Sequence, residues 1–170
     1  NRDRMVDVTA RMQRETSLLP LAHLTAVNHS RAELEQVLQA FADNDIHNVL
    51  ALRGDPPGDP LGVWRKHPDG VEFASELVEI IRERGGFHIG VAAFPSGHFR
   101  APTLEADTQF TLQKLRAGAS FAVTQIFFEA DAYLRLRDRL VAADMESGSR
   151  PLIPSIMPIM SLKSAHRMVQ

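Results

Sequence analysis

Short apolar segments alternate along this chain with longer segments in which apolar residues recur at helical spacing. The short segments have the length of buried strands, and the longer ones are typical of helices that cover one face of a sheet. The predicted strands are residues 20–26, 48–52, 88–93, 121–127 and 152–155. The predicted helices are residues 4–16, 30–41, 69–84, 103–117 and 130–143, followed by one that opens at Ser161.

Capping signals and apolar stripes describe these helices in more detail. Ser30 and Glu33 have the spacing of a capping box, and Asp69 is predicted to cap the third helix with Glu72 at its third position. Gly85 is predicted to end that helix. The predicted apolar faces are Met5, Val8 and Met12; Leu34, Val37, Leu38 and Phe41; Phe73, Leu77, Ile80 and Ile81; and Tyr133, Leu134 and Leu140.

The alternation of helices and strands predicts a parallel α/β sheet joined by right-handed crossovers. Polar residues follow the predicted strands, and ligands bind at the carboxyl ends of strands in such folds. We therefore expect a (β/α)8 TIM-type barrel, with residues 1–170 forming one partial catalytic domain. A complete barrel needs about 250 residues, so about five to six βα units are expected, without the first and last strands. An open doubly wound sheet is the alternative.

The composition limits the classes of function. The 170 residues are 44% hydrophobic and carry a net charge of -2 with dispersed basic residues, which argues against nucleic acid or an anionic membrane as partner. The absence of cysteine excludes disulfides and thiol nucleophiles. The sequence contains no apolar run of about 18 residues, which a membrane span would need. A cytoplasmic location is therefore expected. The oligomeric state stays open, with a homo-oligomer as one option.

The loop after the second predicted strand, residues 53–70, is the most informative segment. It opens with Arg53, Gly54 and Asp55, and a loop this long in a compact domain is usually functional or mobile. Arg53 offers a fixed fork of donors for phosphate or carbonyl oxygens, and Gly54 lets a ligand approach the backbone. The alternative is a loop salt bridge between Arg53 and Asp55.

Other polar residues extend this set. Asp107 and Lys114 are seven positions apart on a predicted helix, so both project from one face. They form either a clamp of opposite charges for a polar ligand or an exposed pair. His23 is either a ligand donor or a satisfied core residue, and His98 is either a donor or solvated. Gln125 lies in an otherwise apolar strand, where a buried amide needs partners, so it is a candidate to bind a substrate ring.

Motifs for other chemistries are absent. There is no G-x-G-x-x-G, P-loop, H-E-x-x-H or G-x-S-x-G segment, so Rossmann, P-loop, catalytic-zinc and hydrolase interpretations lack support and no metal site is expected. A barrel lyase or aldolase would need a Schiff-base lysine at a strand end. The lysines, Lys66, Lys114 and Lys163, all lie outside the predicted strands.

Several segments, in order along nearly the whole chain, resemble one family. They are His23-Leu24-Thr25, Ala51-Leu52-Arg53-Gly54-Asp55-Pro56-Pro57, Gly97-His98, Leu104-Glu105-Ala106-Asp107, Lys114, Ala117-Gly118-Ala119, Thr124-Gln125-Ile126-Phe127-Phe128 and Ile156-Met157-Pro158-Ile159. They resemble methylenetetrahydrofolate reductase of the bacterial type. The resemblance implies a (β/α)8 barrel that transfers reducing equivalents from NADH or NADPH, through FAD, to 5,10-methylenetetrahydrofolate. Folate and the nicotinamide nucleotide would then be the small-molecule partners.

The resemblance also implies roles for individual residues. The flavin would be bound by His23, Arg53, Gly54, Asp55, Phe94, His98, Asp107 and Lys114. Asp55, near the flavin ring edge, and Gln125, which would meet the folate, are the implied catalytic residues. The family's general-acid Glu is expected upstream of Asn1, and 170 residues alone would be an inactive fragment.

Some positions depart from the family pattern. Phe94 replaces a common Tyr, Phe110 stands where a polar residue is frequent, and Phe99-Arg100 replaces a Pro and an acidic residue. The first two changes remove polar groups from the implied flavin site. Two alternatives therefore stay open: direct hydride transfer from nicotinamide to folate without flavin, and a non-catalytic homologue that binds folate or nucleotide.

Overall fold

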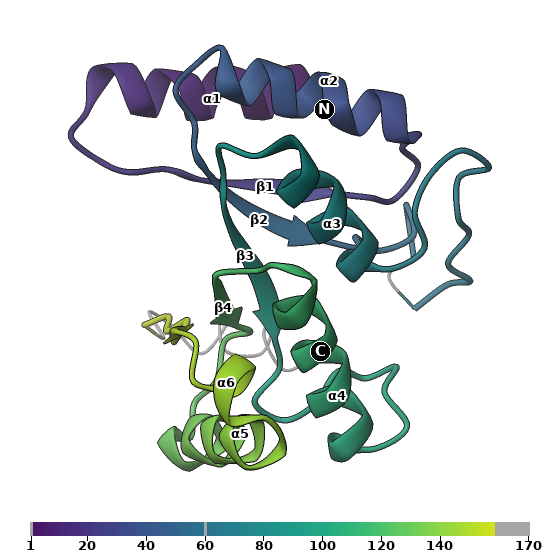
Figure 1. The fold of residues 1–170 in the computed structure, drawn as a ribbon, viewed down its shortest axis with the longest axis vertical. Coiled ribbons are helices and arrows are strands. Elements are labelled where there is room, and N and C mark those ends of the chain that lie inside the picture. The colour runs from purple at the N-terminus through teal and green to yellow at the C-terminus, as the bar shows by residue number, and fades with distance from the viewer. Residues whose placement is uncertain (1, 60, 159–170) are drawn as a thin grey trace.

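The computed structural model describes residues 2–59 and 61–158 of the chain (Figure 1). The strands are β1 (Leu21–Thr25), β2 (Asn48–Leu52), β3 (His88–Ala93), β4 (Phe121–Thr124) and β5 (Leu152–Ile153). The helices are α1 (Arg2–Glu15), α2 (Arg31–Ala42), α3 (Ala74–Arg84), α4 (Leu104–Ala117), α5 (Ala130–Ala143) and α6 (Met145–Gly148). None of the helices in these two ranges is both long and apolar enough to cross a bilayer.

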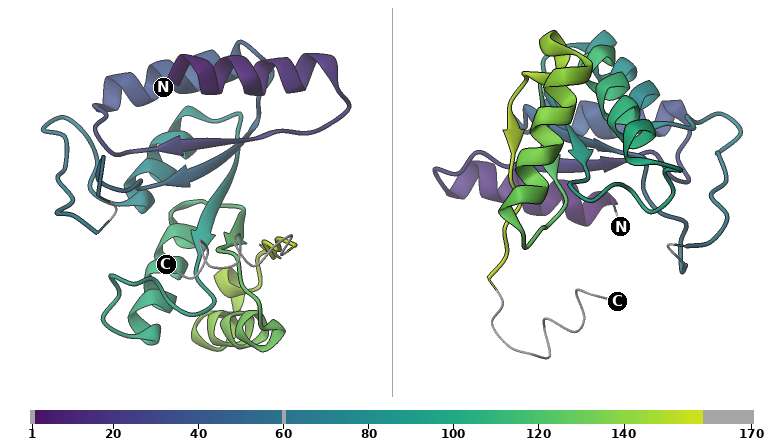
Figure 2. Two further views of the ribbon diagram at one scale, coloured as in Figure 1. Left: turned by 180° about the vertical axis from the view of Figure 1, so that it is seen from behind. Right: turned by 90° about the horizontal axis from the view of Figure 1, so that it is seen from below.

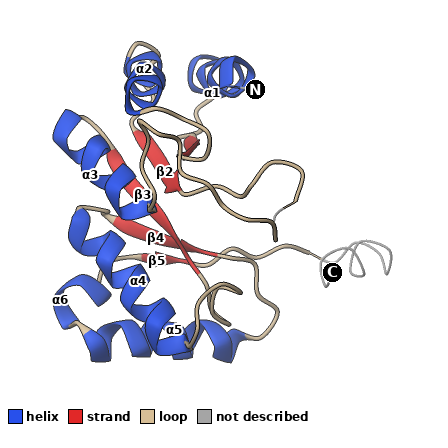
Figure 3. Ribbon diagram, turned by 90° about the vertical axis from the view of Figure 1, so that its right-hand side faces the viewer, coloured by secondary structure: helices blue, strands red, loops and turns tan. Residues whose placement is uncertain are grey.

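The strands form one parallel sheet whose spatial order, β1-β2-β3-β4-β5, is their order along the chain. Figure 3 shows the helices arranged around one side of the twisted sheet, while the other side carries loops. In Figure 2, α1 and α2 (purple and blue) lie together at one end of the sheet, and α4 and α5 (green) lie at the other. A doubly wound sheet would carry helices on both faces, so that alternative is wrong. The arrangement is part of the wall of a (β/α)8 barrel, as predicted.

The face of the sheet beneath the helices carries the apolar core. Ala22 and Leu24 of β1 and Val49 and Ala51 of β2 are buried there, because alternate residues of a strand point to the same face. The core continues through buried residues of β3, α2, α3, α4 and α5. Burial of apolar surface between the sheet and its helices is therefore the main stabilising contribution in this part of the chain.

The opposite face of the sheet corresponds to the inside of a barrel. The parallel register aligns His23 with Leu50, Leu50 with Gly90, and Gly90 with Phe121. A Cβ atom at Gly90 would lie 2.5 Å from Cε2 of Phe121, so the Phe121 ring occupies the space that a side chain at position 90 would need. His23 is exposed on this face, which excludes the core-histidine alternative.

The predicted capping box of α2 and the predicted end of α3 are confirmed, and α4 has a cap that was not predicted. The Ser30 backbone N–H donates to Glu33 Oε2 at 2.8 Å, and the Glu33 N–H donates to Ser30 Oγ at 3.3 Å, which completes the capping box of α2. Thr103 accepts from the Ala106 N–H at 3.1 Å and caps α4. Gly85 ends α3 with a φ of +76°.

The buried face of α1 differs from the prediction. Val8 and Met12 are 53% and 38% exposed, whereas Thr9 and Ala10 are buried. Met5 is partly buried against the core, as predicted. The helix contacts α2 and β1. Thr9 and Ala10 have small side chains that allow this close packing, and a prediction based on large apolar residues does not detect them.

The start of α3 also differs. The predicted cap, Asp69, lies in the preceding loop, where its carbonyl accepts from the Arg31 N–H at 2.8 Å. The helix begins at 74, and Phe73 is 52% exposed instead of buried. Glu76 supplies the capping interaction, because its carboxylate accepts from the backbone N–H groups of Glu72 at 2.6 Å and Phe73 at 3.2 Å.

The C-terminal third contains further differences. β4 ends at Thr124, three residues short of the predicted 121–127, and β5 covers only the first half of 152–155. The short helix α6 was not predicted. In α5, Leu134 is 39% exposed and Leu136 is fully buried in its place. The predicted helix that opens at Ser161 lies outside the described residues.

We expect Leu77→Ala in α3 to destabilise the full-length protein by about 2–5 kcal/mol, because the side chain is fully buried and its removal leaves a cavity. Leu61→Ala is the matched control, since Leu61 is 74% exposed and should change stability by less than about 0.5 kcal/mol. Urea unfolding followed by circular dichroism measures both, and equal losses would contradict the assignment of the core.

Candidate functional site

The carboxyl end of β2 leads directly into Arg53, Gly54 and Asp55. Gly54 has a φ of +81°, and a Cβ atom there would lie 2.6 Å from Cγ1 of Val27. The Val27 N–H donates to the Arg53 carbonyl at 2.9 Å, which extends the pairing of β1 and β2 beyond the strands. Position 54 therefore requires glycine both for its dihedral angle and for the close approach of the neighbouring segment.

The chain's one tryptophan, Trp64, folds back onto this turn. Its Nε1–H donates to the Gly54 carbonyl at 3.1 Å, and the guanidinium carbon of Arg53 lies 5.3 Å from the centroid of the indole ring. Burial is the main cause that lowers the pKa of Arg53, followed by the positive charge of Arg100. Arg53 nevertheless keeps its charge at neutral pH, and its partly desolvated guanidinium interacts more strongly with an anion than a fully hydrated one would.

The segment after β3 carries His98 in a stack of rings. Phe94 meets His98 edge-on with centroids 4.6 Å apart, and His98 stacks on Phe99, also at 4.6 Å. The Arg100 backbone N–H donates to Nδ1 of His98 at 3.1 Å. Because Nδ1 accepts this bond, neutral His98 carries its proton on Nε2 and presents that N–H as a donor.

Asp107 and Lys114 lie on the buried side of α4, so the exposed-pair alternative is wrong. Asp107 is 3% exposed, and its Oδ2 has no hydrogen-bond partner among the described residues. The Lys114 ammonium donates to the Ala92 carbonyl of β3 at 2.5 Å. Burial lowers the pKa of Lys114 to about 8, against the opposing effect of Asp107. The pair combines an acceptor that has no partner among the described residues with a cation whose pKa is lowered by burial.

Five predicted site residues share one electrostatic neighbourhood. Burial is the largest cause that lowers the pKa of His98, followed by the positive charge of Arg53; Lys114 also lowers it, while Asp107 and Asp55 raise it. These charges come from the segments that follow β2 and β3 and from α4. The structure therefore brings Arg53, Asp55, His98, Asp107 and Lys114 together near the carboxyl ends of β2 and β3.

Two other predicted site residues lie on the same sheet, and the Gln125 backbone N–H donates to the Ala93 carbonyl at the end of β3 at 2.7 Å. His23 lies in the middle of β1, and within the described residues no hydrogen bond or ion pair joins it to the others. Gln125 was predicted as a buried amide in a strand, but it is exposed and follows the end of β4. Its side-chain oxygen accepts from the Ile126 N–H at 3.0 Å. The expectation of a buried amide was wrong, because β4 ends at Thr124 and leaves Gln125 just beyond the strand. Its role in substrate binding stays a prediction.

The two phenylalanines that depart from the family pattern have different surroundings. Phe94 is partly buried beside His98. Phe110 is 51% exposed, whereas Asp107 one turn away is buried. Phe110 therefore lies toward the solvent side of α4 and does not share the buried face of Asp107 and Lys114.

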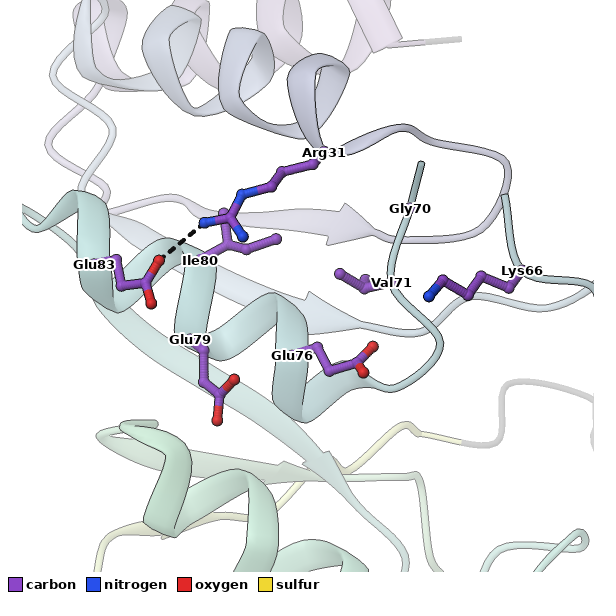
Figure 4. Close-up of a pocket in the computed structure, with 8 residues that line it drawn as sticks. All are labelled: Arg31, Lys66, Gly70, Val71, Glu76, Glu79, Ile80 and Glu83. Carbon is purple, nitrogen blue, oxygen red and sulfur yellow. Dashed lines mark hydrogen bonds and ion pairs between the residues drawn. The ribbon is translucent and has the colours of Figure 1, made fainter. Parts of the chain in front are cut away.

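A separate pocket lies between α2, α3 and the loop that precedes α3 (Figure 4). It is lined by Arg31, Lys66, Gly70, Val71, Glu76, Glu79, Ile80 and Glu83. Arg31 pairs with Glu83 at 2.9 Å, and Glu76 caps α3 as described above. None of the predicted site residues lines this pocket, and its charged groups connect the two helices, so we assign it a structural role.

Sequence reasoning missed several residues that shape the cluster. Trp64 and Arg100 contact it from two loops, and Arg139 of α5 donates to the Pro95 carbonyl at 3.4 Å. A lone tryptophan in the long loop after Arg53 was an available signal for the first. Arg100 was noted only as a departure from the family pattern and Arg139 had no signal, because their contacts depend on how distant segments fold together.

Comparison with known proteins identifies the family. The family model described as methylenetetrahydrofolate reductase matches residues 1–170. The 5,10-methylenetetrahydrofolate reductase of Escherichia coli K12 is 35% identical over 167 residues, which cover 98% of this chain and 53% of that protein. The Salmonella typhimurium enzyme is 36% identical with the same coverage. Methylenetetrahydrofolate reductase 2 of Schizosaccharomyces pombe is 39% identical over 158 residues, 87% of this chain and 24% of that protein.

The chain spans about half the length of the bacterial relatives it matches. The match is continuous, and it includes the cluster described above and the turn that Gly54 makes at the end of β2. Together with the one-sided arrangement of helices on a sequentially ordered parallel sheet, this shows that the chain belongs to the methylenetetrahydrofolate reductase family.

Proposed function

We propose that the full-length protein containing this chain reduces 5,10-methylenetetrahydrofolate to 5-methyltetrahydrofolate with NADH or NADPH, through FAD. It would be a cytoplasmic oxidoreductase of one-carbon metabolism that acts on CH–NH groups, and it could work as a homo-oligomer. The observation that carries the proposal is the gathering of Arg53, His98, Asp107 and Lys114 around one edge of the sheet in a member of this family.

The residues present fit a flavin dinucleotide. Arg53 and Lys114 are cations suited to the pyrophosphate, and His98 offers its Nε2–H as a further donor. Asp107 Oδ2 is a buried acceptor without a partner among the described residues, which suits a ribityl or ribose hydroxyl. Gly54 lets the Arg53 turn pack closely against Val27, which positions Arg53 at the edge of the sheet. When bound, a flavin supplies the capacity to accept and return a hydride.

The remaining roles follow from the family resemblance. Asp55 is exposed at the start of the loop and would lie near the flavin ring edge, where a carboxylate influences the electronics of the ring. Gln125 is exposed beyond β4 and would bind the folate. His23 and Phe94 would contact the cofactor, His23 from the inner face of β1 and Phe94 through its ring beside His98.

Direct hydride transfer from nicotinamide to folate is the second candidate. It is favoured by Phe94, whose ring packs against His98 where the family commonly has a Tyr hydroxyl. In that case the same cations would bind the nicotinamide dinucleotide, which also carries a pyrophosphate. A non-catalytic homologue would bind these ligands without turnover.

The first experiment is an absorption spectrum of the full-length protein, taken after incubation with FAD and desalting, together with an assay of NADH and NADPH oxidation by methylenetetrahydrofolate. We expect retained oxidised-flavin bands and folate-dependent turnover. A colourless protein with turnover would support direct transfer. A protein that binds these ligands but does not turn over would contradict the proposed activity.

We expect Gly54→Ala to weaken FAD binding by about tenfold or more, because the new Cβ would force Val27 and the Arg53 turn to shift. Gly58→Ala is the matched control, since Gly58 has a similar φ of +82° but nothing within 4 Å of an added Cβ. Both variants carry the left-handed strain of about 1–2 kcal/mol, and only the first carries the clash. Flavin fluorescence titration measures the affinities, and equal effects would contradict a specific role for Gly54.

We expect the affinity for FAD to fall as the pH rises from 7 to 9 through the Lys114 pKa of about 8. The protonated ammonium attracts the pyrophosphate and the neutral amine does not, so the affinity is highest below this pKa. Lys114→Met should bind weakly at every pH, whereas Lys66→Met, a change at an exposed lysine, should keep the pH dependence. An unchanged pH profile in Lys114→Met would contradict the assignment.

A further inference from the structure

Arg53 and Arg100 belong to different loops but converge on one short segment, Gly62 to Trp64. The Arg100 guanidinium donates to the Gly62 carbonyl at 2.7 Å. Two residues further on, the Trp64 ring lies against the Arg53 guanidinium, 5.3 Å from centroid to carbon. The loop after β2 therefore fixes both arginines relative to each other across the carboxyl edge of the sheet.

Aromatic rings support Arg100 from its own loop. Its guanidinium carbon lies 5.0 Å from the centroid of Phe99, which in turn stacks on His98. Phe99 is 60% exposed, so its ring is not held there by burial in the core. Stacking on an aromatic face restricts a guanidinium to a plane and so fixes the direction of its positive charge.

Two like charges meet at this place. Arg100 is close enough to lower the pKa of Arg53, which means that the two guanidinium groups repel each other. Asp55 and Glu72 act on Arg53 in the opposite direction, but with smaller effects than Arg100. A dianionic group between the two arginines would relieve this repulsion, and phosphate oxygens match the donor geometry of guanidinium groups.

We propose that Arg53 and Arg100 together bind a phosphate group of a dinucleotide. The family resemblance implies an acidic residue at position 100, so Arg100 is a departure of this chain from that pattern. The proposal rests on the proposed function in one respect, that the phosphate belongs to a dinucleotide. The shared chemistry fits three sources: the pyrophosphate of FAD, the pyrophosphate of a nicotinamide dinucleotide, or the 2′-phosphate of NADPH.

The test compares Arg100→Gln and Arg100→Glu with wild-type full-length protein, using inorganic pyrophosphate as the probe in isothermal titration calorimetry. We expect Arg100→Gln to raise the Kd by about tenfold, as for the loss of a charge-assisted hydrogen bond, and Arg100→Glu to raise it further. Arg65→Gln is the matched control, because Arg65 is an exposed arginine on the same loop as Trp64. It should leave the Kd within about twofold of the wild-type value, since an exposed charge outside the pair contributes little.

Titrations with FAD, NADPH and NADH then distinguish the sources. A loss confined to FAD identifies the flavin pyrophosphate, a loss confined to NADPH identifies the 2′-phosphate, and equal losses for NADPH and NADH identify the nicotinamide pyrophosphate. The proposal is overturned if wild-type protein does not bind pyrophosphate, if neither Arg100 variant changes the affinity for pyrophosphate and for all three nucleotides, or if Arg65→Gln causes the same loss.

The test of the Arg53–Arg100 anion site can fail or succeed independently of the test of reductase activity. The pyrophosphate titration requires no turnover, so a protein without reductase activity can still confirm the anion site. Conversely, normal turnover with unchanged binding in Arg100→Gln would uphold the reductase and remove Arg100 from the site. Arg100 is exposed, and thermal unfolding of each variant checks that the substitution leaves the fold intact.

Discussion

The parallel pairing of β1, β2 and β3 in their order along the chain is the constraint on which the site depends. It brings the segments that follow consecutive strands to one edge, and the hydrogen bond from Val27 to the Arg53 carbonyl continues the pairing past the strand ends. Gly54 is the point where this closeness is tightest, since a single added carbon would overlap Val27. The strand pairing and the backbone hydrogen bond from Val27 therefore position the Arg53 turn.

Within the described residues, an aromatic ring contacts Arg53 and a main-chain carbonyl contacts Lys114. Trp64 supports Arg53, the ring stack of Phe94, His98 and Phe99 supports the second loop, and Lys114 is held by a main-chain carbonyl. Neutral partners leave a cation's charge available, whereas a carboxylate at contact distance would cancel much of it. The cost is partial desolvation of the cations, visible in the lowered pKa values of Arg53 and Lys114. Sites that bind anionic ligands have this property, because the ligand restores the favourable charge balance.

Local signals and long-range packing were not predicted equally well from the sequence. The capping box of Ser30, the strand at His88–Ala93 and the Asp107–Lys114 face were all predictable, because each depends on residues within two helical turns or one strand. The start of α3 was not, because a contact with Arg31 of α2 draws Asp69 into the loop and Glu76 caps the helix instead. Gln125 was misplaced for a similar reason: the length of β4 depends on where the chain must leave the sheet, not on local apolarity.

The sequence by itself determined the alternation of strands and helices and a set of polar residues at strand ends specific enough to indicate the family. These features follow from short-range periodicity and from motif spacing. Only the tertiary structure decided which of those residues meet. It placed Gln125 beside the end of β3, turned Phe110 toward solvent, and joined Arg100 to Arg53 through Gly62 and Trp64. Contacts between distant loops depend on the register and twist of the sheet beneath them, which no local pattern encodes.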